Sequence, residues 1–495
     1  MENSMNSIGV QNPKPLVVDL DGTLIYSDML HESAIRVLRD QPLKLLLIPA
    51  LLLKGKAKLK AYLAEQTAFD PSTLPYNQEL ILWLRNQKEG GRKIILCTAS
   101  HQSIATLIAG DLGIFDQIIA TDSDLNIAGK NKADALVAQF GEGGFDYVGN
   151  SSADIAVWEK ASEGITVNAS QNTINGAQRA CNIVSNFPQK NDSAKNILKM
   201  LRVHQWLKNI LLFSPLLAAH QFSNWQGWTS LFLAFIAFSL CASSVYITND
   251  LLDLDSDRRH FRKSRRPLAS GAVPIWMGVL LSPTLLIISL MVASNVNTSF
   301  MGWLITYFVI TCAYSWGLKR LVLIDCITLA ILYTLRIIAG ASAIQNNLSF
   351  WLLAFSIFLF LSLAFVKRYA ELENKENSFT ESSRGNEKIH GRGYYAGDAP
   401  IIQTLGIASG YAAVIVFALY LNSDAVIKLY PTPEFVWGEV PILLFWISWV
   451  WIKTHRGDMH EDPLIFAIKD RVSQVTGLAF ATVLLFSTRG LLWWK

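Results

Sequence analysis

The sequence predicts a soluble α/β domain followed by an all-α polytopic membrane domain. Three observations support this: the first 190 residues mix charged and apolar residues, short apolar runs in this part end in polar side chains, and long apolar stretches begin at about Leu207. A stretch of about 20 apolar residues is the length that crosses a bilayer. We therefore expect one domain over residues 1–190 and a second over residues 191–495.

The composition of the chain excludes several classes of protein. A net charge of +4 over 495 residues gives no reason to expect binding to nucleic acid. The five cysteines form no Cys-x-x-Cys pair, so neither a disulfide framework nor a zinc site is expected. The polar segment from Met1 to Lys14 does not have the pattern of a signal peptide, so we expect the first domain to stay in the cytoplasm.

The second domain contains nine apolar stretches of spanning or near-spanning length, which predict a multi-pass protein of the cytoplasmic membrane. They are centred near Leu216, Ala237, Leu285, Tyr307, Leu332, Ser356, Ala413, Trp446 and Leu484. The first contains Pro215, so an interfacial or kinked start fits it as well as a clean span does.

The orientation follows from Lys and Arg in the connections between these stretches. The connections after the second, fourth, sixth and eighth stretches are rich in both residues, whereas the opposite connections carry only Lys428. By the positive-inside rule, the rich connections face the cytoplasm, and the C-terminal residues Trp493 to Lys495 lie on the other side.

Three predicted strands of the first domain end in chemically active side chains. After Leu16-Val17-Val18 comes Asp19-Leu20-Asp21-Gly22-Thr23, a second apolar run ends in Thr98-Ala99-Ser100, a third is followed by Asn150 and Asp154, and Lys130 and Lys132 lie between the last two. The carboxyl ends of parallel strands meet at one edge of a sheet. Carboxylates, a hydroxyl and a lysine at this edge are what Mg²⁺-assisted phosphoryl transfer through an aspartyl intermediate requires.

This ordered set resembles the haloacid dehalogenase superfamily over about Leu16 to Ser162. The resemblance implies a Rossmann-like fold in which Asp19 is the nucleophile and Asp21 the acid and base. It also implies that the phosphate is bound by Thr98, Ser100 and Lys132 or Lys130, and that the metal lies near Asp19, Asp21, Asn150 and Asp154. The family usually has an aspartate where Asn150 stands, and an amide offers Mg²⁺ an oxygen without a charge. A folded module without activity is the alternative.

The segment from Tyr26 to Leu84 follows the first strand and would form a helical cap. Within it, the apolar stretch from Leu43 to Leu53 is too short to cross a bilayer, so we expect a buried or membrane-touching helix there.

A cluster of acidic residues ends the second apolar stretch of the membrane domain. It consists of Asn249, Asp250, Asp253, Asp255 and Asp257. On a helix, Asp250, Asp253 and Asp257 share one face. Since close carboxylates repel one another, Mg²⁺ carrying a diphosphate is the expected occupant. The basic run that follows includes Arg265 and Arg266, which either mark topology or hold an anionic substrate.

Together with Arg265-Arg266-Pro267, this cluster resembles the UbiA-type prenyltransferases over about Lys199 to Lys495. The second aspartate pair of that family is replaced here by Lys367-Arg368-Tyr369-Ala370-Glu371-Leu372. This segment, the segment from Arg202 to Asn209, and Asp462-Pro463-Leu464 with Asp470-Arg471 resemble the polyprenyl-phosphate phosphoribosyltransferase branch, which acts in cell-wall synthesis. The resemblance implies substrate contacts by Asn249, Lys208, Arg265, Arg266, Lys367, Arg368, Glu371, Asp462 and Arg471.

The expected reaction is Mg²⁺-dependent transfer of a phosphoribosyl group from phosphoribosyl pyrophosphate to a polyprenyl phosphate. The fused domain would then remove the 5-phosphate from the lipid-linked product. One alternative keeps the fold and transfers a prenyl group from its diphosphate to an aromatic or other small acceptor. Another is a transporter with a regulatory phosphate-sensing domain.

Overall fold

The computed structural model describes residues 13–122, 126–188, 193–376, 393–423, 430, 433–459 and 462–489. The chain forms two compact units. The first comprises Met1–Arg202 and Tyr246–Pro283, and the second comprises Val203–Val245 and Thr284–Lys495. The first unit thus includes a segment that the sequence groups with the membrane domain.

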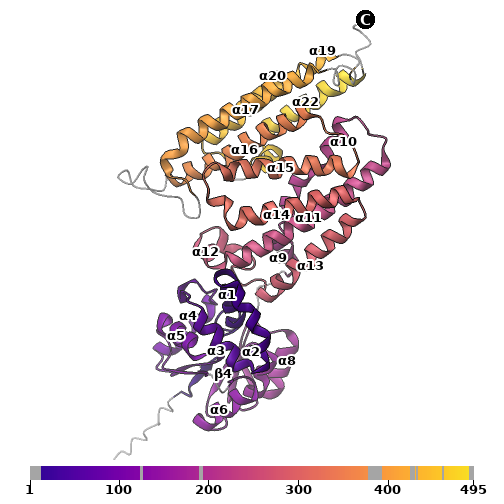
Figure 1. The fold of residues 1–495 in the computed structure, drawn as a ribbon. Helices are drawn as coiled ribbons and strands as arrows, with labels where there is room; N and C mark the ends of the chain where they lie inside the picture. The colour runs from indigo at the N-terminus through magenta and orange to yellow at the C-terminus, as the bar shows by residue number, and fades with distance from the viewer. Residues whose placement is uncertain are drawn as a thin grey trace, which may run out of the picture. The chain divides into compact units, whose positions relative to one another are not determined.

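A six-stranded, all-parallel sheet forms the core of the first unit (Figure 1). Its order is β3-β2-β1-β4-β5-β6, with bounds β1 Leu16–Val18, β2 Ile94–His101, β3 Gln117–Thr121, β4 Asp146–Gly149, β5 Glu163–Val167 and β6 Asn182–Phe187. Strand β1 is fully buried at the centre because helices cover both faces of a parallel sheet. The α/β fold predicted for this part is therefore confirmed, and β1, β2 and β4 bring their carboxyl ends to one edge.

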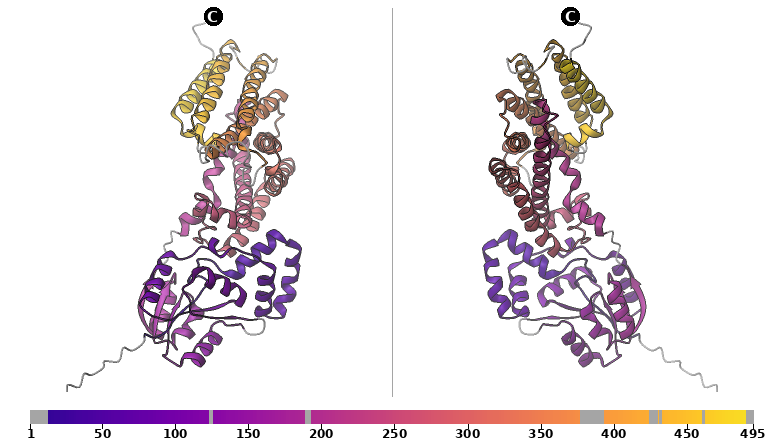
Figure 2. Two further views of the ribbon diagram at one scale, coloured as in Figure 1. Left: turned by 90° about the vertical axis from the view of Figure 1, so that its left-hand side faces the viewer. Right: turned by 90° about the vertical axis from the view of Figure 1, so that its right-hand side faces the viewer.

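Helices pack against this sheet, and further helices of the same unit are inserted after β1 or follow β6 (Figure 2). Their bounds are α1 Met29–Asp40, α2 Ile48–Leu53, α3 Lys56–Gln66, α4 Gln78–Glu89, α5 Gln102–Leu112, α6 Lys130–Phe140, α7 Ile155–Trp158, α8 Gln171–Ala180 and α9 Ser193–Leu201. The insertion between β1 and β2 is helical, as predicted. Helix α4 belongs to the sheet layer rather than to the inserted helices, because Leu80 and Leu84 are buried in the same core as Leu16 and Ile94.

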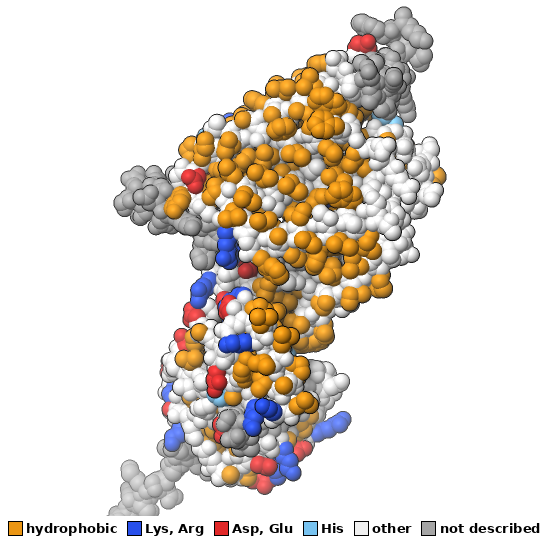
Figure 3. All heavy atoms as spheres, viewed as in Figure 1, with side chains coloured by type: hydrophobic (Ala, Val, Ile, Leu, Met, Phe, Trp, Pro, Cys, Tyr) orange, Lys and Arg blue, Asp and Glu red, His pale blue; other side chains and the backbone are white. Residues whose placement is uncertain are grey.

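The described residues that follow α9 form helices joined by loops. The bounds are η4 Val203–Phe213, α10 Ser214–Ala218, α11 Trp225–Leu252, α12 Leu254–Arg259, α13 Ile275–Ser294, α14 Thr298–Trp316, α15 Ile324–Ala343, α16 Phe350–Glu376, α17 Ala399–Leu421, α19 Pro433–Val436, α20 Glu439–His455, α21 Pro463–Lys469 and α22 Arg471–Arg489. Figure 3 shows hydrophobic side chains over the visible face of this helical part, as expected for surfaces that contact lipid.

Within the described residues, six helices are long and apolar enough to cross a membrane. They are Trp225–Leu252, Ile275–Ser294, Ile324–Ala343, Phe350–Glu373, Ala396–Leu421 and Glu434–His455. Six of the nine predicted stretches correspond to them, so the chain is a multi-pass membrane protein.

The other three predicted stretches differ from this set. A single spanning helix near Leu216 is wrong, because Pro215 lies at the start of the five-residue α10 after a 3₁₀ segment. Helices α14 and α22 contain 19 residues each, and Thr, Ser, Tyr and Trp lower the hydropathy of α14. Lys428 and Trp493 to Lys495 lie outside the described residues.

Candidate functional site

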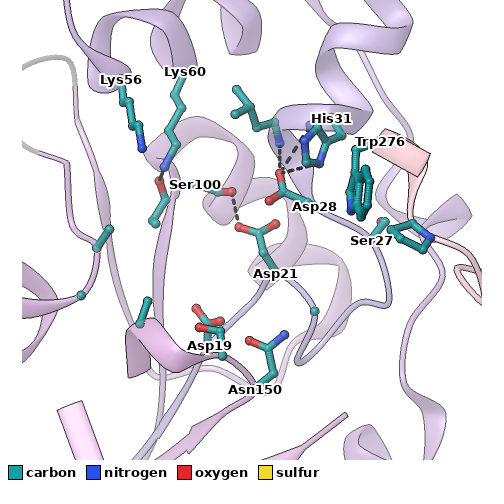
Figure 4. A pocket seen from close by; sticks show the side chains of 18 of the residues that line it. Asp19, Asp21, Ser27, Asp28, His31, Lys56, Lys60, Ser100, Asn150 and Trp276 are labelled. Atoms are coloured by element: carbon teal, nitrogen blue, oxygen red, sulfur yellow. Dashed lines mark hydrogen bonds and ion pairs between the residues drawn. The ribbon is translucent and has the colours of Figure 1, made fainter. Parts of the chain in front are cut away.

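The first unit contains a cavity of about 550 Å³ at the carboxyl ends of β1, β2 and β4. This volume lies within the range of small-molecule sites. Among the side chains that line it are Asp19, Asp21, Ser100, Lys132 and Asn150 (Figure 4). The strand ends singled out from the sequence therefore meet at one cavity.

Asp19 and Lys132 form a buried ion pair at the base of this cavity. The Nζ of Lys132 donates to Oδ1 of Asp19 at 2.7 Å and to the hydroxyl of Tyr147 at 3.0 Å. Burial raises the pKa of Asp19 to about 6, although Lys132 acts in the opposite direction. Lys130 is exposed at the first residue of α6. Of the two lysines that the sequence left open, Lys132 is thus the one that contacts Asp19.

Asp21 is held by two donors from different elements. Its Oδ1 accepts from the backbone N–H of Met29 and its Oδ2 from the hydroxyl of Ser100, both at 2.8 Å. Burial, followed by the nearby carboxylates of Asp28 and Asp19, raises the pKa of Asp21 to about 7. A carboxyl group with a pKa near neutrality suits an acid and base.

The two predicted hydroxyl ligands lie differently in the structure. Ser100 lines the cavity. Thr98 is fully buried, and its Oγ1 accepts from the N–H of Ser100 at 2.9 Å. Ser100 is therefore the one of the two whose hydroxyl lies at the cavity, while Thr98 supports the backbone beneath it.

Asp154 orders the loop that carries Asn150. Its Oδ2 accepts from the N–H groups of Asn150 and Ser151 at 3.1 and 3.0 Å, and its Oδ1 accepts from the hydroxyl of Tyr147 at 2.7 Å. Both oxygens are thus already bonded by protein donors, and direct metal ligation by Asp154 stays a prediction.

Gly22 and Asn150 lie in close contact. Gly22 has a φ of +75°, and a Cβ at this position would lie 2.0 Å from Nδ2 of Asn150. The amide oxygen of Asn150 lies on the side of Asp19 (Figure 4). The side-chain oxygens of Asp19 and Asn150 are hard donors of the kind that Mg²⁺ prefers, so these residues fit a bound magnesium ion.

Several residues that line this cavity were not predicted from the sequence. The inserted helices contribute Asp28, His31, Lys56 and Lys60, and α13 contributes Trp276. Lys56 and Lys60 are four residues apart on one helix, a spacing that the sequence alone could have revealed. Trp276 gave no such signal, because it lies more than 120 residues beyond the last of the strand-end motifs.

A second arrangement of charged residues in the first unit surrounds the end of α11. Helix α11 ends at Leu252, and Asp253 separates it from α12. Backbone hydrogen bonds from Asp253 to Asn249 and from Asp257 to Asp253 continue the turn across this junction. Asp250 and Asp257 therefore remain near each other, as the sequence spacing predicts.

Arginines lie among these carboxylates. Arg266 forms ion pairs with both Asp250, at 3.0 Å, and Asp257, and Arg202 forms a further ion pair with Asp250. Burial raises the pKa of Asp257, which Arg266 opposes. Asn249 is half-buried beside Asp250 in the last turn of α11.

Two residues of the predicted cluster point elsewhere. Asp255 forms ion pairs with Arg36 and Arg39 of α1, at 2.7 and 2.8 Å. The guanidinium of Arg265 lies over the ring of Phe261, with 5.6 Å between them. These two residues are therefore separate from the Asp250 and Asp257 pair.

The Asp250 and Asp257 pair also fits a divalent cation. Oδ1 of Asp257 is buried and accepts no hydrogen bond among the described residues, and the Nζ of Lys263 lies 3.9 Å from it. In that same part of the chain, no group of three or more His, Cys, Asp or Glu side chains is arranged around a metal position. Mg²⁺ usually binds through one or two carboxylates together with substrate phosphates and water, so a pair of carboxylates meets its needs.

The second unit brings together predicted residues from three distant segments. Lys208 of η4 donates to Asp462 at 2.6 Å, Lys367 of α16 lies 3.9 Å from the same carboxylate, and the hydroxyl of Tyr333 donates to it at 3.1 Å. Burial acts to raise the pKa of Asp462, but Lys208 and Lys367 outweigh it and lower the pKa. The result is a cluster with two lysines for one carboxylate.

Other predicted residues of the second unit lie apart from this cluster. Arg368 is fully buried and forms ion pairs with Asp325, at 2.6 Å, and with Glu371. Arg471 is exposed at the start of α22. Arg368 and Glu371 thus belong to an ion-pair network with the buried Asp325 that the sequence did not reveal, since Asp325 is 43 residues away from Arg368.

Comparison with known proteins identifies both parts of the chain. The model of the haloacid dehalogenase-like hydrolases matches residues 16–159, and that of the UbiA prenyltransferase family matches residues 210–377. The uncharacterized protein y4nM of Sinorhizobium fredii is 34% identical over 94% of this chain and 90% of its own length. The decaprenyl-phosphate phosphoribosyltransferase of Mycolicibacterium smegmatis is 30% identical over 59% of this chain and 92% of its own length.

Among solved structures, a UbiA homologue from Archaeoglobus fulgidus bound to GPP and Mg²⁺ matches with a TM-score of 0.41. It is 17% identical, and the match covers 59% of this chain and 99% of that one. On the strength of the family models and the relatives, the chain belongs to the UbiA prenyltransferase family as a membrane transferase with an N-terminal haloacid dehalogenase-like domain.

Proposed function

We propose that the chain transfers a phosphoribosyl group from phosphoribosyl pyrophosphate to a polyprenyl phosphate in a Mg²⁺-dependent reaction. The observation that carries this proposal is the 30% identity to a decaprenyl-phosphate phosphoribosyltransferase over 92% of the length of that enzyme. The pair of lysines around Asp462 supports it, because a reaction between two anionic substrates needs positive charge for the acceptor as well as for the donor.

The chemistry follows from the charges of the residues. Asp250 and Asp257 would hold Mg²⁺, which when bound neutralises the pyrophosphate leaving group. The bond between C1 of the ribose and the pyrophosphate oxygen breaks, and positive charge develops at C1. An oxygen of the polyprenyl phosphate then forms the new bond to C1. Within the second unit, Lys208 and Lys367 are point charges of the kind that bind a phosphate, and their ion pairs with Asp462 would fix their positions.

The N-terminal domain would act next, as a phosphatase on the 5-phosphate of the lipid-linked product. A carboxylate oxygen of Asp19 attacks the phosphorus, the bond to the ribose oxygen breaks, and Asp21 gives that oxygen a proton. Water then attacks the aspartyl phosphate and returns a proton to Asp21, so one water is consumed and inorganic phosphate leaves. The raised pKa of Asp21, about 7, supports its role as the proton donor.

We also propose that the N-terminal domain and the Asp250 and Asp257 pair face the cytoplasm. The basic connections support this orientation through the positive-inside rule. Ion pairs between α1 and the segment after α11 support a common side of the membrane for these two parts, since Arg36 contacts Asp255 and Glu32 contacts Arg258.

Label transfer tests the transferase proposal. Membranes that contain the chain receive polyprenyl phosphate and phosphoribosyl pyrophosphate labelled in the ribose, and we expect the label in the lipid fraction. Asp250→Ala should remove this product, whereas the matched control Asp255→Asn, whose carboxylate contacts α1, should retain it. Label that passes instead from a prenyl diphosphate to a small acceptor would refute the proposal in favour of prenyl transfer. Lipid product that persists in Asp250→Ala would contradict the role of the pair.

A further inference from the structure

The cavity of the first unit has a second group of lining residues beyond the strand ends. Lys56 and Lys60 come from α3, Leu52 from α2 and Trp276 from α13. In Figure 4, the two lysines lie on one side of Asp21, and Trp276 lies on the other side beside His31. The cavity is therefore larger than a phosphate group, and the additional lining is both cationic and apolar.

Lys60 supplies a positive charge that is separate from Lys132. Its Nζ donates to the carbonyl of Ala99 at 2.6 Å and to Oδ1 of Asn126 at 3.0 Å. Both acceptors are neutral, whereas Lys132 is paired with Asp19. Burial lowers the pKa of Lys60, so an anion placed beside its ammonium would stabilise the charged form. Lys56, one turn earlier, is exposed.

The inserted segment that contributes Leu52 to the lining also carries exposed leucines. Leu43, Leu46 and Leu53 are 79%, 77% and 91% exposed. Trp276 is the second residue of a helix that is long and apolar enough to cross a membrane. Exposed leucines with lysines nearby are typical of segments that touch the membrane interface. The inserted segment next to Leu52 and the helix that carries Trp276 therefore both suit contact with lipid.

We propose that Lys56, Lys60, Leu52 and Trp276 form a second subsite, which binds the phosphodiester and first prenyl unit of a lipid-linked substrate while Asp19 acts on its terminal phosphate. This inference rests on the phosphatase reaction proposed above and defines its substrate class. The substrate is an amphiphile with two phosphate groups, a monoester that is cleaved and a diester that joins the lipid. A soluble sugar phosphate occupies only the first position.

The carboxylate of Asp28 also lines the cavity, and its negative charge would repel a bound phosphate. It caps the start of α1 by accepting from the N–H of Leu30 at 2.8 Å, and it lies on the Trp276 side of the cavity in Figure 4. The diester is therefore assigned to the side of Lys56 and Lys60, and the apolar chain passes toward Leu52 and Trp276.

The test compares release of inorganic phosphate from two probes, farnesyl-phosphoryl-ribose 5-phosphate in detergent micelles and ribose 5-phosphate in solution. The full chain carries Asp250→Ala throughout, so that the transferase does not consume the lipid probe. We measure the ratio of kcat/KM for the lipid probe to kcat/KM for the soluble probe. Loss of a charge-assisted hydrogen bond in Lys60→Met should lower this ratio by about 10- to 100-fold. Lys56→Met and Trp276→Ala should lower it as well.

Lys58→Met is the matched control, because Lys58 is exposed on the same helix and does not line the cavity. Its ratio should stay equal to that of the parent chain. Lys60→Arg keeps the positive charge, so its ratio of kcat/KM values should stay close to that of the parent chain. Phosphate release from ribose 5-phosphate shows that each variant is folded. The second subsite would be refuted if Lys60→Met and Trp276→Ala gave the same ratio of kcat/KM values as Lys58→Met. If the parent chain releases phosphate from neither probe, the phosphatase proposal itself fails, and the subsite fails with it.

Discussion

A buried carboxylate joins helix α1 to the segment that follows α11, and its removal gives a quantitative prediction. Glu32 is 1% exposed and accepts from Arg258 at 2.6 and 3.1 Å. Arg36 lies 3.1 Å from the same carboxylate, and both arginines are themselves buried. Substitution Glu32→Gln would leave two buried guanidinium groups without this counter-ion.

The expected effect is large because the charges that remain cannot reach water. Loss of one partner of a buried ion pair costs about 3–5 kcal/mol. Burial acts to raise the pKa of Glu32, but Arg258 and Arg36 outweigh it and lower the pKa, so the carboxylate is charged at neutral pH. A loss of about 3 kcal/mol of stabilising free energy would raise the population of molecules in which α1 is locally unfolded on the order of 100-fold.

Native-state hydrogen exchange of the α1 amides, Met29–Asp40, measures this opening in the full-length chain. The exposed pair of Arg259 and Asp70 is the matched control, since it also joins the segment inserted after β1 to the segment after α11, at 3.1 Å. Asp70→Asn should change exchange less than tenfold, because solvent screens an exposed ion pair and leaves it little influence on stability. Equal exchange in Glu32→Gln and Asp70→Asn would refute the reasoning.

Three further predictions follow from the same structure. The rate of phosphate release should decrease as the pH drops below about 6, where Asp19 becomes protonated. Added Mg²⁺ should shift this decrease to lower pH, because a nearby cation favours the ionised carboxylate. A pH profile that is the same with and without Mg²⁺ would contradict this prediction. Gly22→Ala should lower kcat for phosphate release at least tenfold, because the added Cβ would collide with Asn150. Gly91 has a similar positive φ but open space around it, so Gly91→Ala should retain activity despite comparable backbone strain. Equal losses of kcat in the two variants would contradict the role of this contact. A reporter fused after Lys495 should be protected on the extracytoplasmic side, and a cytoplasmic signal would remove the predicted orientation.

The sequence was sufficient for the elements whose signals are local. A short apolar strand followed by Asp19-Leu20-Asp21-Gly22-Thr23 predicts a catalytic edge, because strand-end position follows from chain order alone. Long apolar helices can also be predicted from the sequence, since length and hydropathy decide whether a helix crosses a bilayer. Near Leu216 the sequence left a clean span and a kinked start open, because a proline within an apolar run changes the backbone without changing the apolar character that predicts a span, and the structure excludes the clean span.

Only the tertiary structure decided which side chains meet across the chain. It selected Lys132 over Lys130, because a helix places one of two nearby lysines toward Asp19. It separated Asp255, which contacts α1, from the Asp250 and Asp257 pair. It also brought Trp276 to a cavity built by residues far earlier in the sequence. Hydrophobic periodicity and spacing report the face on which a residue lies, whereas the partner that it meets depends on how distant elements pack.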